Sequence, residues 1–299
     1  MIEINEALTK MTIVSNRCKL NRLMFAMLAL AALPCANAAE VRDERFVLAG
    51  GMITEVVYAL GRQDLVVGVD TTSLAPASAL KEKSNVGYLR ALSAEGILSL
   101  NPTKLITTAH AGPPAVLDSI KESGVSIVYV PEPTSEAEII ANVRSIAREV
   151  SKPEEGEAIA RQIEKGFEDL ALAREKKAAK ARVLFVLSSQ NGRLTVAGQN
   201  TSADFMIRLA GAENAMSGLN GYKLVTNEAI VNAAPDAVLM ISRGAEEANK
   251  DVMLSHPGIA LTPAAANGKV IIMDGLYLLG LGMRTPRAAL ELHAKVFAK

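Results

Sequence analysis

The sequence predicts an α/β protein with two α/β lobes that contain parallel-type sheets, a long spine helix that joins the lobes and a ligand cleft between them. Three observations support this fold class. Strand and helix patterns alternate before residue 151, a charged stretch without a helix breaker follows, and the alternation resumes after residue 182. At 299 residues the chain is long enough for two such lobes, each with its own core.

Residues 1–38 have the layout of a secretory signal peptide. Three basic residues precede an apolar run at 23–33, and small residues at 36–38 follow it. The run is too short to span a bilayer, so we expect cleavage after Ala38 rather than a retained anchor. A lipoprotein signal at Cys35 is disfavoured, because Pro34 takes the place of the small residue required there. Met11 is an alternative start of translation.

Cysteine and charge usage narrow the class of protein further. Both cysteines, Cys18 and Cys35, lie in the leader, so the mature chain has no disulfide and depends on its hydrophobic cores. The full chain has 32 basic and 32 acidic residues, and removing four basic and two acidic residues with the leader leaves 28 and 30. This balance gives no electrostatic footprint for nucleic acid or for an anionic membrane.

The first lobe, residues 39–151, opens with a strand, a tight turn, a helix and a second strand. We assign Gly50 and Gly51 to the turn, because no G-x-G-x-x-G follows and Asp70 alone does not indicate a dinucleotide site. Gly61 is placed to end the helix. Later elements are a short helix capped by Ser93, a strand at 104–108, a helix at 114–122, a strand at 125–130 and a helix that begins near Ser135.

A single helix is expected to join the lobes over residues 152–181. From Pro153 roughly 25 residues run without a breaker, which at about 1.5 Å each gives nearly 40 Å. Its apolar stripe consists of Ile159, Ile163, Phe167, Leu170 and Ala173. The second lobe, residues 182–299, has expected strands at 183–187, 194–197, 237–241 and 270–273, helices at 203–209, 227–233 and 286–297, and a loop at 274–285.

The segment 86–114 holds most of the side chains that suit a ligand site. Tyr88 and Arg90 lie in a loop, and His110 follows the strand at 104–108. Ligands of open α/β sheets bind at the carboxyl ends of strands, so His110 is a candidate ligand contact.

The other two histidines have simpler interpretations. His256 precedes a Pro-Gly turn and His293 lies in the final helix, so both are expected to be surface or capping residues. Three scattered histidines without cysteine argue against a zinc-binding protein.

A short internal repeat connects the two lobes. Residues 93–106 and 226–239 share a cap residue, a glutamate, an apolar turn, a proline and a buried strand at a constant offset of 133. Acidic residues are common in the first turn of a helix, which accounts for either glutamate alone. As a pair at equivalent points of two lobes, Glu95 and Glu228 also suit a partner that offers two arginines.

These features together resemble the periplasmic substrate-binding proteins of ABC importers for haem, cobalamin and ferric siderophores. Within that family the chain is most similar to the bacterial haem-transport binding proteins, through VGYLRALSAEGILSL, the following AGPP, HPGIALTPAAANGKVIIMD and LLGLGMRTPRAAL. The resemblance covers essentially the whole mature chain. It implies a monomeric, non-enzymatic periplasmic protein with haem as transported ligand, an ABC permease as partner and an outer-membrane haem receptor upstream.

The resemblance also implies roles for single residues. Tyr88, the tyrosine of the VGY-x-R motif, is the axial ligand of the haem iron, and Arg90 hydrogen-bonds near it. Arg243 reaches the haem from the second lobe. Glu95 and Glu228 meet arginines of the permease.

Elementary chemistry agrees with the role of Tyr88. A phenol, with an ordinary pKa of about 10, ligates as phenolate only where cations stabilise the anionic form, and ferric iron and a guanidinium such as that of Arg90 both do so.

Some relatives have a histidine in the loop that corresponds to residues 188–192 and bind a second haem. This loop has no histidine here, which argues against a second haem.

Two alternatives stay open. A cobalamin or ferric-siderophore carrier would keep the lobes and the glutamates but needs no tyrosine ligand. An exported enzyme that uses Tyr88 or His110 as acid or base is the weaker alternative, because the sequence has no nucleophile elbow, triad spacing or P-loop.

Overall fold

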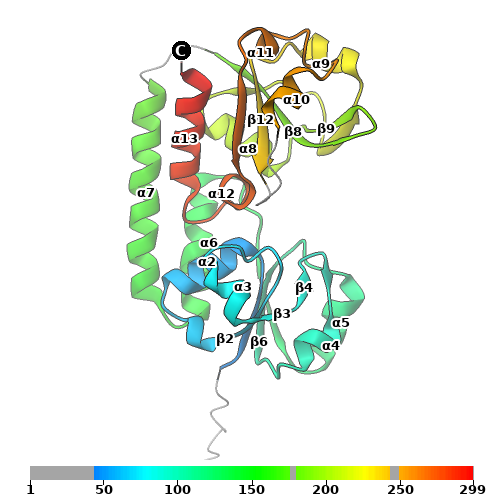
Figure 1. Cartoon of the computed structure of the whole chain (residues 1–299). Coiled ribbons are helices and arrows are strands. Elements are labelled where there is room, and N and C mark those ends of the chain that lie inside the picture. Colours follow the sequence, from blue (N-terminus) through cyan, green and yellow to red (C-terminus); the bar gives the residue numbers. More distant parts are fainter. Residues whose placement is uncertain (1–43, 176–179, 243–248, 299) are drawn as a thin grey trace, which may run out of the picture. The chain divides into compact units, whose positions relative to one another are not determined.

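The computed structural model describes residues 44–175, 180–242 and 249–298. The expected signal peptide at residues 1–38 and the candidate ligand residue Arg243 lie outside the described residues. Glu44–Lys299 form one compact unit. Within it the structure has two β-sheets flanked by helices, which confirms the α/β fold class (Figure 1).

The first sheet is entirely parallel, with strand order β3-β2-β1-β6-β7. Its strands are β1 (Phe46–Ala49), β2 (Val66–Val69), β3 (Ser84–Asn85), β6 (Lys104–Thr108) and β7 (Ser126–Val130). The accompanying helices are α2 (Gly51–Ala59), the 3-10 helix η1 (Gln63–Leu65), α3 (Ser78–Glu82), α4 (Ala94–Leu98), α5 (Pro114–Glu122) and α6 (Glu136–Glu149). The central strand β1 lies between β2 and β6, and all four of its residues are buried.

The second sheet is mixed, with order β11-β9-β8-β12-β13 and β10 beside β8. Its strands are β8 (Arg182–Gln190), β9 (Arg193–Ala197), β10 (Glu213–Asn214), β11 (Tyr222–Val225), β12 (Ala237–Ser242) and β13 (Val270–Asp274). Strand β9 is antiparallel to both β8 and β11. Residues 188–190, which were expected to form a loop, extend β8 into a hairpin with β9. Its helices are α8 (Ser202–Leu209), α9 (Asn227–Ala233), α10 (Lys250–Leu254), α11 (Pro263–Ala266), α12 (Gly275–Leu279) and α13 (Thr285–Phe297).

Both sheets are covered on their two faces. One continuous core packs residues of α2 and α6 on the first sheet and residues of α8, α12 and α13 on the second. A separate core lies under α4 and α5, and another under α9 and α11. Side-chain burial of this extent supplies the main driving force for folding, which agrees with a chain whose described part contains no cysteine.

The long helix α7 (Pro153–Glu175) packs against α6 and α13 (Figure 1). Gly156 lets α7 approach α6 closely, since a β-carbon there would lie 2.2 Å from the Cβ of Ala147. Gly166 does the same for α13, where a β-carbon would lie 2.8 Å from Pro286. Small residues at both contacts therefore fix the distance of α7 from each neighbour. No helix in the described ranges is long and apolar enough to cross a membrane.

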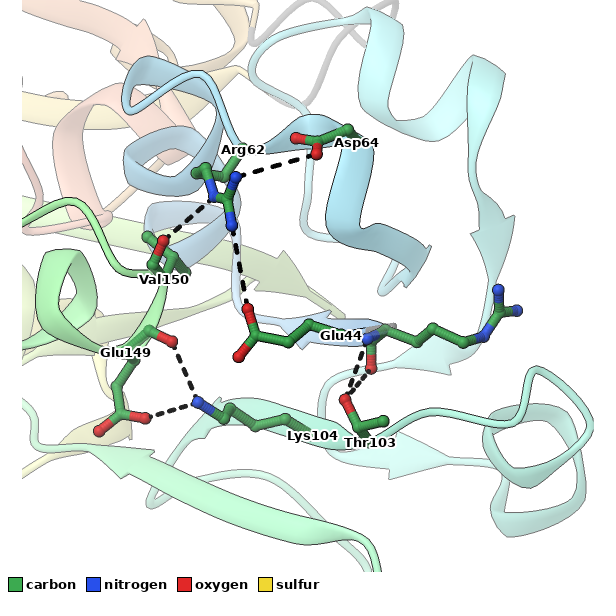
Figure 2. A network of polar contacts seen from close by, with 8 residues as sticks. Glu44, Arg62, Asp64, Thr103, Lys104, Glu149 and Val150 are labelled. Atoms are coloured by element: carbon green, nitrogen blue, oxygen red, sulfur yellow. Dashed lines mark hydrogen bonds and ion pairs between the residues drawn. The ribbon is translucent and has the colours of Figure 1, made fainter. Parts of the chain in front are cut away.

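A network of polar contacts lies at the amino ends of the first sheet's strands (Figure 2). Lys104 begins β6, and its Nζ donates to the backbone carbonyl of Glu149 at 3.0 Å and to the carboxylate of the same residue at 2.9 Å. Arg62 donates from Nε to the carbonyl of Val150 at 3.1 Å and lies 3.9 Å from the Glu44 carboxylate. These bonds hold the end of α6 to the sheet, away from the carboxyl ends of the strands.

One expectation about the second lobe is wrong, and another holds only in part. Residues 275–279 of the expected loop form α12, because the side chain of Asp274 caps it by accepting from the amide of Tyr277 at 2.8 Å and Leu278 is fully buried. His293 is a capping residue but not a surface residue: it is 6% exposed, and its Nδ1 lies 2.9 Å from the carbonyl of Ala210, the C-cap of α8. His256 does cap a turn, because its Nδ1 accepts from the amide of Gly258 at 3.2 Å.

The internal repeat is present in the backbone. The hydroxyl of Ser93 accepts from the third residue of α4 at 3.0 Å, and the hydroxyl of Thr226 accepts from the third residue of α9 at 3.2 Å. Asn101 and Ala234, 133 residues apart, both take a left-handed conformation, with φ of 48° and 44°. Each precedes a proline, and the strands β6 and β12 begin three residues later. Shared unusual dihedral angles make duplication a stronger interpretation than the sequence match alone.

Candidate ligand-binding site

The candidate ligand residues Tyr88 and Arg90 lie on a small hairpin formed by β4 (Gly87–Tyr88) and β5 (Ala91–Leu92). Gly87 has φ of 99°, and a β-carbon there would lie 2.9 Å from the carbonyl oxygen of Ala91. Only glycine meets both conditions without strain. The hairpin therefore depends on the glycine that precedes the tyrosine.

Backbone hydrogen bonds attach this hairpin to the carboxyl ends of two strands. Thr71, which follows β2, donates to the carbonyl of Gly87 at 2.9 Å. Gly112, which follows β6, donates to the carbonyl of Leu89 at 3.0 Å and accepts from the amide of Leu92 at 2.8 Å. The hairpin is thus held at the edge of the sheet where open α/β proteins bind their ligands.

The polar side chains of the hairpin are accessible. Tyr88 is 48% exposed although it is a large aromatic residue, and Arg90, in the turn, is also exposed. A phenol and a guanidinium two residues apart form a combination that can stabilise negative charge on the phenol oxygen. This arrangement suits a ligand that carries a hard cation or anionic groups.

His110 lies in the turn that follows β6, and its side chain is exposed. Its amide lies 3.3 Å from the hydroxyl of Thr108, and it is two residues before Gly112, which bonds to the hairpin. The structure thus brings His110 to the same sheet edge as the hairpin. No group of three or more His, Cys, Asp or Glu residues within the described ranges is arranged to hold a metal ion.

The loop after β2 bonds to the hairpin and is itself held in place by Asp70. Asp70 is fully buried and accepts four hydrogen bonds: from the amides of Gly50 and Thr72, and from the hydroxyls of Thr72 and Ser73, at 2.7 to 3.0 Å. A buried carboxylate is tolerated when donors saturate it. Asp70 therefore fixes the loop that bonds to Gly87 and the turn at Gly50, which the sequence predicted from its two glycines.

The paired glutamates begin two helices of the internal repeat and are not residues of this hairpin. Glu95 lies in the first turn of α4 and Glu228 in the first turn of α9, and both are exposed. Neither carboxylate forms an ion pair with a described residue. Their position leaves them accessible to a second protein.

One aromatic residue that sequence reasoning missed is Tyr222, at the start of β11 and 39% exposed. Burial raises the pKa of its phenol first, and the nearby Glu132 carboxylate raises it further, while hydrogen bonds with Ala203 and Thr201 and the charge of Arg90 act in the opposite direction. The phenol is therefore neutral at physiological pH. The Gly-Tyr pair before the second copy of the repeat was the signal that could have revealed it.

The comparison with protein families shows to which family the chain belongs. A family model described as "Periplasmic binding protein" matches residues 47–276, which include both sheets and the hairpin. The chain belongs to this family. Periplasmic binding proteins of this kind are the substrate-binding components of ABC importers, and they partner with a permease rather than catalyse a reaction.

Two curated relatives of this periplasmic binding protein differ in what their names state. The vitamin B12-binding protein of Vibrio vulnificus (strain CMCP6) is 27% identical over 250 residues, which cover 83% of this chain and 87% of that protein. An uncharacterized ABC transporter substrate-binding lipoprotein, YvrC of Bacillus subtilis (strain 168), is 26% identical over 190 residues. That match covers 62% of this chain and 60% of the length of YvrC.

Solved structures give higher identity. The periplasmic heme-binding protein RhuT from Roseiflexus sp. RS-1, in its apo form, is 37% identical with a TM-score of 0.80, over 85% of this chain and 98% of that chain. BhuT, a periplasmic heme-binding protein solved with two hemes, gives the same identity and TM-score over 85% and 97%. A periplasmic heme-binding protein from Pseudomonas aeruginosa is 35% identical with a TM-score of 0.77, over 85% and 92%.

Proposed function

We propose that this protein captures ferric haem in the periplasm and delivers it to the permease of an ABC importer. The observation that carries the proposal is the hairpin of β4 and β5, which holds a half-exposed tyrosine two residues from an arginine at the carboxyl edge of the first sheet. The three structures compared above come from proteins named as haem-binding, at 35 to 37% identity. This identity is higher than that to the relatives named for vitamin B12.

In this proposal Tyr88 ligates the ferric iron as phenolate. Arg90 stabilises the negative charge on the phenolate oxygen, and His110 contacts the ligand from the neighbouring loop. Arg243 pairs with a haem propionate from the second lobe, since a guanidinium binds a carboxylate with two parallel hydrogen bonds.

Delivery uses a different surface. Glu95 and Glu228 start equivalent helices and remain exposed, so we assign them to two arginines of the permease. Residues 1–38 direct export and are removed, residues 39–151 and 182–299 form the two lobes around the ligand cleft, and residues 152–181 join them. An outer-membrane haem receptor supplies the ligand to the monomeric protein.

A second candidate function is transport of cobalamin. It is favoured by the match to the vitamin B12-binding protein of Vibrio vulnificus, which covers 83% of this chain. Cobalamin brings its own cobalt ligands, so binding would not depend on a phenolate. The two functions therefore differ in what a single substitution at Tyr88 does.

The test is to titrate the purified protein separately with hemin and with cyanocobalamin. Hemin binding with a Soret shift and a tyrosinate charge-transfer band is expected, and Tyr88→Phe should remove the band and lower the hemin affinity at least tenfold. Tyr129→Phe, which changes another exposed tyrosine of the first lobe, is the control and should bind as the parent does. Cyanocobalamin binding without hemin binding would replace haem by cobalamin as the substrate.

A further inference from the structure

The internal repeat extends one step further toward the ligand site than residues 93–106. Gly87-Tyr88 precedes the capped helix with Glu95, and Gly221-Tyr222 precedes the capped helix with Glu228. The first tyrosine lies five residues before its cap and the second lies four. Both glycines have positive φ, 99° for Gly87 and 70° for Gly221. Tyr222 is thus the second lobe's counterpart of Tyr88.

The surroundings of Tyr222 hold its ring in a defined place. It pairs with Ala197 across β9 and β11, and its ring centroid lies 6.3 Å from that of Phe185, a fully buried residue. Tilted aromatic pairs at this distance are favourable beyond the area they bury. Yet 39% of the residue remains accessible, so one part of the ring stays available for another contact.

The hydroxyl of Tyr222 is already engaged. It forms hydrogen bonds with the amide of Ala203 and the side chain of Thr201, at the beginning of α8. The Thr201 side chain is itself fixed, because its hydroxyl donates to the carbonyl of Gly198 at 2.9 Å and accepts from the amide of Asp204 at 3.1 Å. The polar end of Tyr222 is therefore tied to the protein, and what it offers outward is aromatic carbon.

Charges from the first lobe lie close to the same residue. Arg90, in the hairpin of Tyr88, and Glu132, after β7, both act electrostatically on the phenol. Glu132 also accepts a hydrogen bond from the hydroxyl of Ser202 at 3.2 Å, directly beside Thr201. The start of α8 therefore contacts the first lobe through Glu132, and the charge of Arg90 acts on the phenol in the opposite direction to that of Glu132.

We propose that Tyr222 is the aromatic contact of the second lobe for a flat tetrapyrrole ligand, opposite the metal-binding Tyr88. Its ring packs on the macrocycle while its hydroxyl stays bonded to α8, so it does not ligate the metal. The inference rests on the proposed function and adds a residue that determines specificity for planar, aromatic ligands. A ring held in advance loses little side-chain entropy on binding.

Three substitutions at this position test the proposal with hemin as probe. Tyr222→Leu keeps apolar packing on Phe185 but removes the flat ring, and it should lower the hemin affinity about tenfold. Tyr222→Phe keeps the ring and should lose less than Tyr222→Leu. Both should retain the tyrosinate charge-transfer band that Tyr88→Phe removes. Lys223→Ala, on the opposite face of β11, is the matched control.

The outcomes separate this inference from the proposed function. If Tyr222→Leu, folded by circular dichroism and urea titration, binds hemin as tightly as the parent, the ring makes no contact and the inference fails while haem binding stands. If Tyr222→Phe removes the charge-transfer band, Tyr222 is an iron ligand and the inference also fails. If the parent binds cyanocobalamin instead of hemin, the proposed haem transport and the inference both fail, because a corrin ring is neither flat nor fully conjugated.

Discussion

Gly112 and Leu89 are joined by a backbone hydrogen bond of 3.0 Å, which connects the loop after β6 to the turn between Tyr88 and Arg90. The carbonyl of the same glycine accepts from the amide of Leu92, so the turn and strand β5 of the hairpin both bond to one residue. The position of the candidate iron ligand is therefore set by a segment distant from it in sequence. Changes to the hairpin backbone should affect binding as strongly as changes to its side chains.

Substitution of Gly87 by alanine tests this dependence. The β-carbon would lie 2.9 Å from the carbonyl of Ala91 in a backbone conformation that disfavours it, so we expect a loss of about 1–3 kcal/mol in stability and at least a tenfold loss of hemin affinity. Gly124→Ala is the matched control, because its φ is 84° but its β-carbon meets nothing within 4 Å. Urea unfolding and hemin titration of both variants measure the two effects. Unimpaired hemin binding by Gly87→Ala would show that the hairpin is not needed.

Removal of Arg90 should change the pH dependence of haem binding. A proton and ferric iron compete for the phenol oxygen of Tyr88, and a neighbouring cation makes protonation of that oxygen less favourable. In Arg90→Ala the acid limit of the tyrosinate complex should therefore move to higher pH. Charge-transfer absorbance followed from pH 9 to 5 gives the midpoint. Arg90→Lys, which keeps the charge, should move it less, and an unshifted midpoint in Arg90→Ala would contradict the role.

The double substitution Glu95→Ala, Glu228→Ala should separate binding from transport. Both glutamates are exposed and neither is a residue of the hairpin, so hemin titration should be unaltered, whereas uptake in cells that express the cognate permease should fall at least tenfold because an interface charge pair loses one partner. Glu154→Ala removes an exposed first-turn glutamate outside the repeat and serves as the control. Normal uptake by the double variant would reduce both residues to charges that stabilise helix starts.

Asp70→Asn should destabilise the first lobe without removing any exposed group. One carboxylate oxygen would become an amide that faces donors of Gly50, Thr72 or Ser73, and a buried donor without an acceptor costs about 2–4 kcal/mol together with the lost charge-assisted bonds. Urea unfolding measures the change. Asp118→Asn, on an exposed position of α5, is the control and should lie within about 0.5 kcal/mol of the parent.

Alkaline titration of tyrosine absorbance should show Tyr222 as a late component. Its pKa is raised by burial and by Glu132, so the folded protein keeps the phenol protonated while an unfolded chain ionises near pH 10. This difference lowers stability as pH rises above 10, and Tyr222→Phe should remove that part of the loss. Arg90→Ala should move the component to still higher pH, because the guanidinium opposes the shift. A component that titrates below pH 10 and disappears in Tyr222→Phe would contradict the assignment.

Much of the fold could be predicted from sequence because its signals are local. The strand β6 and the helices α5 and α9 occupy the expected residues, and Ser93 caps α4 as expected. Gly61 follows α2 with φ of 69° and donates to the carbonyl of Tyr58, as a helix-ending glycine does. In each case periodicity, a cap residue or a glycine specifies the element within a few residues.

The remaining features depend on contacts distant in sequence. The two-residue strands β4 and β5 have no periodicity of their own and exist through bonds to Thr71 and Gly112. His293 is buried where α13 packs on α8, and the carbonyl of Ala210, 83 residues away, bonds to its Nδ1. Tyr222 was overlooked because one residue fewer separates it from its cap, so a constant offset of 133 does not align it with Tyr88.

The amide of Ser93 donates to the carbonyl of Val86 at 3.3 Å, so the cap of α4 is bonded to the base of the hairpin that holds Tyr88. A movement of that hairpin would therefore be transmitted to the start of α4, whose first turn contains Glu95. The proposed ligand contact and the proposed permease contact of the first lobe are thus joined by a single backbone hydrogen bond.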